Sequence, residues 1–121
     1  AYDFLPGDMD KISKRLQEWV DEEGVDLILT CGGTGIGPED VVPEATRRVI
    51  EKELPAITEA IRQEARRKNP ESLFSREVAG VRKKSVIINL SGTEKGTRDG
   101  LETILPAIPI GLEQLSGKKE S

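Results

Sequence analysis

The sequence contains no histidine and a single cysteine, Cys31. Without histidine, neither a Ser-His-Asp triad nor a histidine-ligated zinc site can be formed by these residues. A lone cysteine rules out a disulfide within this sequence and a CxxC redox motif, and it is compatible with the reducing cytoplasm that we expect for this protein. A catalytic metal would need oxygen ligands, which favours Mg²⁺.

Aromatic residues, long apolar runs and excess positive charge are also scarce. With two phenylalanines, one tyrosine and one tryptophan, the core must be built mainly from aliphatic side chains. No apolar run approaches the roughly 20 residues that span a bilayer, so we expect no membrane segment. The net charge of -4 argues against a nucleic-acid partner, because binding a phosphate backbone normally requires a basic face. The length of 121 residues fits one domain, 1–121.

Strand-like and helix-like segments alternate along the chain. A helix starting at Asp8 or Asp10 and ending at Gly24 is indicated by apolar residues at helical spacing. The other expected strands are 1–5 (the end of a strand), 25–30, 78–81 and 85–90, and the other expected helices are 44–54 (interrupted near Pro55), 57–65 and 97–105. This order predicts an α/β fold, a three-layer α/β/α arrangement with a mainly parallel sheet.

Two loops, 31–40 and 91–96, follow the apolar strands. Because ligands bind at the carboxyl ends of parallel strands, we expect both loops at one edge of the sheet. The first contains Gly32-Gly33-Thr34-Gly35-Ile36-Gly37, whose backbone N–H groups could approach a phosphate, although such loops also serve as tight turns. Gly37-Pro38-Glu39 fits neither a Walker A loop nor a dinucleotide fingerprint.

Two longer segments are more specific. Residues 29–46, LTCGGTGIGPEDVVPEAT, resemble the signature of the MogA/MoaB family, in which T-G-G-T-G precedes D-V-T-P-[DE]-A. Residues 75–82, SREVAGVR, and 88–95, INLSGTEK, resemble the second block of the same family. The resemblance implies a molybdopterin-binding domain, commonly a homotrimer, that uses Mg²⁺ and ATP to transfer AMP to the terminal phosphate of molybdopterin. It also implies a MoeA-type partner for metal insertion.

The resemblance assigns roles by position. Asp40 would hold Mg²⁺ and act in catalysis, although an aspartate here also suits the start of a helix. The family's acidic catalytic residue after a proline corresponds to Gly7 or Asp8, depending on a one-residue shift, and we favour Asp8. Lys95 could equally be an ordinary surface lysine, and Arg76 and Arg82 could pair with acids. The expected substrate-binding or nucleotide-binding residues are Gly32, Gly33, Thr34, Gly35, Ser75, Arg76, Asn89, Ser91, Gly92 and Lys95.

Departures from the family pattern leave alternatives open. The family begins with a further strand and helix, which we expect to be missing here. Ser91 replaces the usual proline, and Glu94 should weaken phosphate binding beside Lys95. A molybdopterin-binding or assembly protein without catalysis, or a CinA-like nucleotide-processing domain, are the alternatives. Gly33-Thr34-Gly35 and the Asn-Leu-x-Gly block favour the adenylyltransferase.

Overall fold

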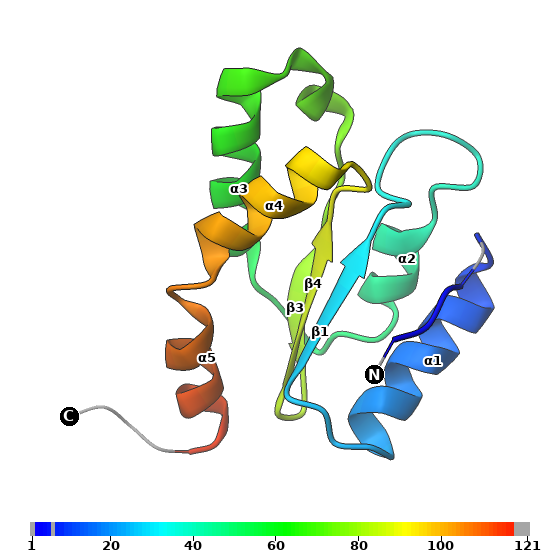
Figure 1. The fold of residues 1–121 in the computed structure, drawn as a ribbon. Coiled ribbons are helices and arrows are strands. Elements are labelled where there is room, and N and C mark those ends of the chain that lie inside the picture. Colours follow the sequence, from blue (N-terminus) through cyan, green and yellow to red (C-terminus); the bar gives the residue numbers. More distant parts are fainter. Residues whose placement is uncertain (1, 6, 118–121) are drawn as a thin grey trace.

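Helices cover both faces of a four-stranded sheet in the computed structural model, which describes residues 2–5 and 7–117 (Figure 1). In chain order the elements are α1 (Met9–Asp21), β1 (Leu27–Cys31), α2 (Val42–Arg47), β2 (Lys52–Glu53), α3 (Pro55–Lys68), the 3₁₀ helix η1 (Pro70–Phe74), β3 (Ala79–Arg82), β4 (Ser85–Leu90), α4 (Glu94–Ile104) and α5 (Ile108–Leu115). Among the described residues, no helix has the length and apolar character needed to cross a membrane.

The sheet has the strand order β1-β4-β3-β2. Only β1 and β4 run parallel, whereas β4 with β3 and β3 with β2 are antiparallel. The prediction of an α/β fold is confirmed, but the described sheet is mixed where a mainly parallel one was expected. The reason lies in the connection between β3 and β4, where Arg82 pairs directly with Ser85. Two residues are enough for a hairpin, whereas a parallel pair needs a long crossover.

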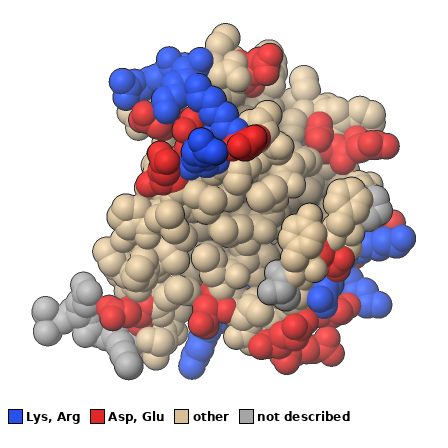
Figure 2. All heavy atoms as spheres, viewed as in Figure 1, with Lys and Arg blue, Asp and Glu red and all other residues tan. Residues whose placement is uncertain are grey.

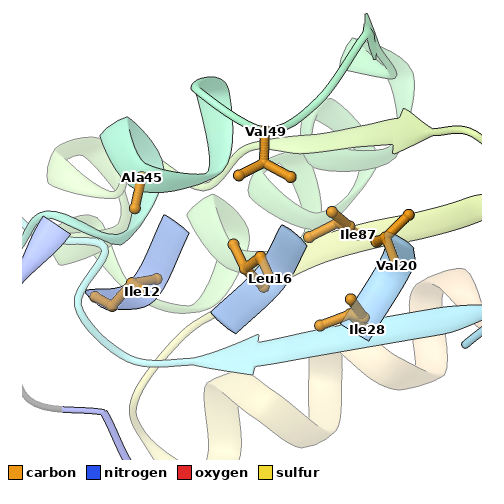
Figure 3. Packing of buried hydrophobic residues seen from close by; sticks show 7 residues of the cluster. All are labelled: Ile12, Leu16, Val20, Ile28, Ala45, Val49 and Ile87. Atoms are coloured by element: carbon orange, nitrogen blue, oxygen red, sulfur yellow. The ribbon is translucent and has the colours of Figure 1, made fainter. Parts of the chain in front are cut away.

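The first core layer packs α1 and α2 against one face of the sheet (Figure 3). Asp8 caps α1 by accepting a hydrogen bond from the Lys11 N–H at 3.1 Å. Ile12, Leu16 and Val20 follow at four-residue intervals and are all buried, so they form one helical stripe. This stripe meets Ile28 of β1 and Ile87 of β4.

The second core layer lies on the opposite face, beneath α3, α4 and α5. Because side chains alternate along a strand, Ile87 belongs to the first layer while its neighbours Val86, Ile88 and Leu90 belong to the second. All residues of β4 are buried. The strand is therefore the centre of the fold, and its end is held firmly in place.

Several element boundaries differ from the sequence prediction. Residues 2–5 form no strand, and Ala1 lies outside the described residues. The helix expected over 44–54 ends at Arg47, and β2 occupies part of that segment. Pro55 begins α3 instead of interrupting a helix, because proline is favoured at the first position of a helix, where its missing N–H costs nothing.

An ion-pair cluster ties α1 to the β3–β4 hairpin, at the end of the sheet away from the two strand-end loops. The Asp21 carboxylate accepts from Arg82 Nε and Nη2 at 3.1 and 2.9 Å, and Lys83 Nζ lies 3.0 Å from Asp21 Oδ1. Arg82 and then Lys83, by these hydrogen bonds, lower the pKa of Asp21 to about 2. Arg82 is thus engaged in an ion pair far from the loops expected to bind ligand.

We predict that Asp21→Asn lowers the midpoint of thermal unfolding at pH 7. The folded-state pKa of Asp21 lies below its unfolded value, so the stabilisation is fully present above pH ~4 and is lost as pH falls through about 2. Thermal unfolding of both proteins from pH 7 to pH 2 would test this. A difference in unfolding midpoint between wild type and variant that is the same at pH 7 and pH 2 would contradict this prediction.

Candidate functional site

The loops that follow β1 and β4 meet at the edge of the sheet. Gly32 N–H donates to the Leu90 carbonyl at 3.0 Å. A Cβ placed on Gly92 would lie only 3.0 Å from Gly32 Cα, closer than side-chain carbons normally approach backbone. The predicted convergence of the two loops is confirmed. It follows directly from the parallel pairing of Cys31 with Leu90 at the strand ends.

The glycine loop turns sharply because two of its residues adopt left-handed conformations. Gly32 has φ +89° and Gly33 has φ +68°, and such angles are unfavourable for residues with a Cβ. The Gly33 carbonyl accepts from Val42 N–H at 3.2 Å. A Cβ on Gly33 would lie 2.5 Å from Val42 Cγ2. Glycine at this position therefore serves both the turn and the close packing of the loop on the start of α2.

A cleft of about 620 Å³ opens beside these loops. The glycine loop, α3, η1 and the start of α4 form its walls. Of the predicted site residues, six line it: Thr34, Gly35, Asp40, Ser75, Ser91 and Lys95. Six further lining residues were not predicted from the sequence. Arg62, Lys68, Phe74 and Asp99 lie outside the family-like segments, and Glu77 and Thr93 lie within them but carry no ligand signal of their own.

Asp40 lies across the mouth of the glycine loop. Its Oδ2 accepts a hydrogen bond from Gly37 N–H at 2.8 Å. A Cβ on Gly35 would lie 2.9 Å from the same oxygen, so the loop wraps closely around this carboxylate. In the described residues, no three acidic or thiol side chains cluster as a metal site. Asp40 therefore does not belong to a cluster of carboxylates, which suits Mg²⁺ bound mainly through substrate phosphates.

Arg76 fastens the glycine loop from behind. Its guanidinium donates to the carbonyls of Gly35 and Asp40, both at 2.8 Å, and pairs with Glu44 of α2. The hydrogen bond from Arg76 to the Glu44 carboxylate lowers the pKa of Glu44. Arg76 lies outside the residues that line the cleft, and its donors are taken by protein groups. In this structure Arg76 holds the loop, and its expected contact with substrate stays a prediction.

Asn89 is fully buried and supports the loops from below. Its Oδ1 accepts from Val78 N–H at 3.0 Å, and its Nδ2 donates to the hydroxyls of Thr30 and Thr46 at 2.9 and 3.0 Å. A side chain with no exposed surface and with both ends of its amide bonded cannot contact a ligand. The expected ligand contact is therefore wrong for the Asn89 side chain, which instead joins β1, β4 and α2.

The start of α4 faces the cleft. Thr93 caps the helix by accepting from Gly96 N–H at 3.0 Å, and Thr97 Oγ1 donates to the Ser91 carbonyl at 2.7 Å. The positive end of the helix dipole is thus directed toward the space beside Ser91 and Lys95. Glu94 Oε1 lies 3.3 Å from Arg98 Nη2, and Glu94 does not line the cleft. Its carboxylate is therefore directed away from the cleft that Lys95 lines, where it was expected to weaken phosphate binding.

Basic side chains gather over the C-terminal end of α3, at the upper left of Figure 2. These are Arg66, Arg67 and Lys68. Lys68 reaches the cleft, where its Nζ lies 3.5 Å from Asp99 Oδ2 of α4. The cleft lining thus holds basic and acidic side chains together, with Arg62, Lys68 and Lys95 beside Asp40, Glu71, Glu77 and Asp99.

Asp8 is the predicted catalytic residue that the structure does not bring into the cleft. It caps α1 and does not belong to the cleft lining. The preceding Gly7 packs against the glycine loop, since a Cβ on it would lie 2.8 Å from the Glu39 carbonyl. Asp8 is thus close to the outside of the loop, where it serves as a helix cap.

The sequence and fold were compared with known proteins. The model of the family described as "Probable molybdopterin binding domain" matches residues 1–110. This chain belongs to that family. Its fold matches the molybdopterin biosynthesis enzyme MoaB of Thermus thermophilus, with 45% identity and a TM-score of 0.85 over 95% of this chain and 72% of that one. A CinA protein from Thermoplasma acidophilum, at 19% identity and a TM-score of 0.58, shares the fold alone over 84% of this chain and 73% of that one.

Several curated relatives carry the name molybdopterin adenylyltransferase. The protein from Helicobacter pylori J99 is 40% identical over 96% of this chain and 66% of its own length. The protein from Haemophilus influenzae is also 40% identical, over 94% of this chain and 64% of its own length. The domain described here thus spans just under two thirds of the length of these relatives.

We predict that Gly33→Ala destabilises the domain by more than backbone strain alone. Gly24 is the matched control, because its φ is +62° and no atom lies within 4 Å of an added Cβ. Gly24→Ala should cost about 1 kcal/mol, and Gly33→Ala about 1–3 kcal/mol more through contact with Val42. Urea unfolding of both variants measures the difference, and Val42→Ala should recover part of it. Equal losses for the two glycines would contradict the close packing.

Proposed function

We propose that the domain takes part in molybdenum cofactor biosynthesis as a nucleotidyltransferase, moving AMP from ATP to the terminal phosphate of molybdopterin. The convergence of Gly32 and Gly92 beside a cleft that contains Asp40 and Lys95 carries this proposal. The name of the Helicobacter and Haemophilus relatives supports the same activity.

The reaction asks little of the protein's own side chains as acids or bases. A phosphate monoester has a second pKa of about 6 and is mostly a dianion at neutral pH. Its oxygen forms a bond to the α-phosphorus of ATP, the bond from that phosphorus to the bridging oxygen breaks, and pyrophosphate leaves. No histidine is required. The work of the site is to hold two polyanions in line and to offset their charge.

The cleft offers two sources of positive potential for that purpose. Lys95 lies on its wall and the N-terminus of α4 faces it, whereas the charge of Lys68 is paired with Asp99. Residues 34–37 of the glycine loop line the cleft, and the lack of a side chain at Gly35 lets a ligand approach the backbone closely. Together these features suit the phosphates of both substrates better than a neutral ligand.

The residues present fit Mg²⁺ through Asp40. One oxygen of this carboxylate is held by Gly37 N–H at 2.8 Å, which fixes the direction of the group toward the cleft. When bound, Mg²⁺ would neutralise charge on the phosphates of ATP. Asp40 would supply the negative charge that holds the ion, which the amide of asparagine could not replace.

The activity can be tested directly on the full-length protein. Incubation with molybdopterin, ATP and Mg²⁺ should release pyrophosphate and yield an adenylylated pterin, both of which chromatography can follow. Binding of molybdopterin without any pyrophosphate would favour the alternative of a binding or assembly protein and would contradict a transferase.

We predict that Asp40→Asn retains the fold and reduces AMP transfer by at least about 100-fold. The amide oxygen can still accept from Gly37 N–H, so the loop is kept while the charge is lost. Initial rates at saturating substrate, with circular dichroism as the folding check, provide the measurement.

Glu39→Gln is the matched control, because Glu39 is the exposed neighbour and does not line the cleft. It removes the same charge from the same loop. An Asp40→Asn rate equal to that of Glu39→Gln would end the assignment of Asp40.

A homotrimer, a MoeA-type partner and a cytoplasmic location stay predictions from the family resemblance. We predict that the full-length protein elutes at three times its monomer mass in size-exclusion chromatography with light scattering. A stable monomer at micromolar concentration would contradict this.

A further inference from the structure

Glu77 is a buried carboxylate that the proposed chemistry does not use. Its side chain is 3% exposed, yet the residue lines the cleft. It follows Ser75 and Arg76 in the segment between η1 and β3. A carboxylate at such a depth costs free energy unless its oxygens are bonded, so its partners indicate what it does.

A chain of hydrogen bonds runs from α3 to the cleft through Glu77. Thr58 Oγ1 donates to the Pro55 carbonyl at 3.2 Å, and Arg62 Nη2 donates to Thr58 Oγ1 at 3.2 Å. Arg62 Nη1 donates to the Glu77 carbonyl at 3.1 Å and lies 3.4 Å from Glu77 Oε2. Ser75 Oγ donates to Glu77 Oε1. The cleft lies at the serine end of this chain.

The direction of every bond in the chain is fixed by chemistry. A guanidinium can only donate, and an ionised carboxylate can only accept. The single hydroxyl proton of Ser75 is therefore committed to Glu77. What Ser75 can still offer to the cleft is a pair of acceptor lone pairs.

The Arg62–Glu77 ion pair joins a half-buried guanidinium, 31% exposed, to a carboxylate that is 3% exposed. Such a pair is often no more stabilising than apolar residues of similar volume, because desolvation offsets the attraction between the charges. Arg62 lies against Oε2 of Glu77, and Oε1 accepts from Ser75 on the wall of the cleft.

We infer that Glu77 is a positioning residue that fixes Ser75 as an acceptor, and that Ser75 receives an N–H group from the ring system of a substrate instead of contacting a phosphate. This inference rests on the proposed function for its ligands. Ionised phosphates present only acceptor oxygens, which an acceptor hydroxyl would repel. Pterin and adenine rings both carry N–H donors, and either could occupy this position.

Glu77→Gln tests the inference by reversing one bond. Because Arg62 only donates, the amide oxygen of glutamine should face Arg62, leaving its NH₂ group to face Ser75. The hydroxyl proton would then turn toward the cleft and oppose an incoming N–H. We expect the affinity for one ring-bearing ligand to fall about tenfold, while the affinity for inorganic pyrophosphate does not fall.

The experiment is a double-mutant cycle on the full-length protein. Wild type, Ser75→Ala, Glu77→Gln and the double variant are each titrated with molybdopterin, ATP and pyrophosphate by calorimetry. If Glu77 acts through Ser75, the double variant should match Ser75→Ala. The ligand whose affinity falls shows whether the pterin ring or the adenine ring contacts Ser75. Asp21→Asn, which neutralises an ion pair at the far end of the sheet, should leave all affinities unchanged.

Three results would overturn the inference. The first is an unchanged affinity of Glu77→Gln for both molybdopterin and ATP, and the second is an equal loss of its affinity for pyrophosphate. The third is a double variant whose loss of affinity is the product of the losses in Ser75→Ala and Glu77→Gln. If Glu77→Gln fails to fold, Ser75→Ala alone decides, since it must weaken a ring ligand and spare pyrophosphate. A wild type that binds ATP but not molybdopterin would end the proposed function and leave the cycle readable with ATP. A wild type that binds neither overturns both.

Discussion

The parallel pairing of β1 with β4 is the constraint on which the site depends. Because the two strands run side by side in register up to Cys31 and Leu90, both loops leave the sheet at one point and must share a narrow space. A Cβ on Gly92 would lie 3.0 Å from Gly32 Cα, so the two loops pack backbone against backbone at this point. β4 is buried along its whole length, so the position of this junction is set by both core layers and not by the loops themselves.

Several polar side chains around the junction form hydrogen bonds that hold the loops in place and leave no exposed group for a ligand at Asn89. Arg76 binds two carbonyls of the glycine loop, and Asn89 satisfies three partners beneath it. Left unpaired, buried groups of this kind would each cost about 1–3 kcal/mol. The arrangement frees the backbone of the loop and a few wall residues, such as Asp40 and Lys95, to face the cleft.

The sequence was sufficient to predict the α/β class, the bounds of β4 and the meeting of the two loops, because periodicity and strand-end position are local or nearly local signals. It could not distinguish residues that touch ligand from residues that support the loop. Asn89 and Ser91 stand two positions apart in one motif, yet one is fully buried and the other lies at the cleft. Nor could it reveal Arg62 or Glu77, since their roles arise from the packing of α3 against the segment after η1. The antiparallel β3–β4 hairpin was likewise hidden, because the Lys83 turn contains no glycine and adopts φ +52° with lysine.

The chain of hydrogen bonds through Glu77 links α3 to the hydroxyl of Ser75 on the wall of the cleft. Lys95 and the α4 N-terminus offer charge and dipole, which attract any anion without reading its shape. A hydroxyl whose proton is committed to a buried carboxylate instead distinguishes a donor from an acceptor. Since α3 supplies Arg62 and Thr58, the discrimination is fixed by a helix outside both sequence motifs. Attraction of phosphates and recognition of a ring would thus be carried by separate elements, which meet only because the sheet brings the two strand-end loops beside α3.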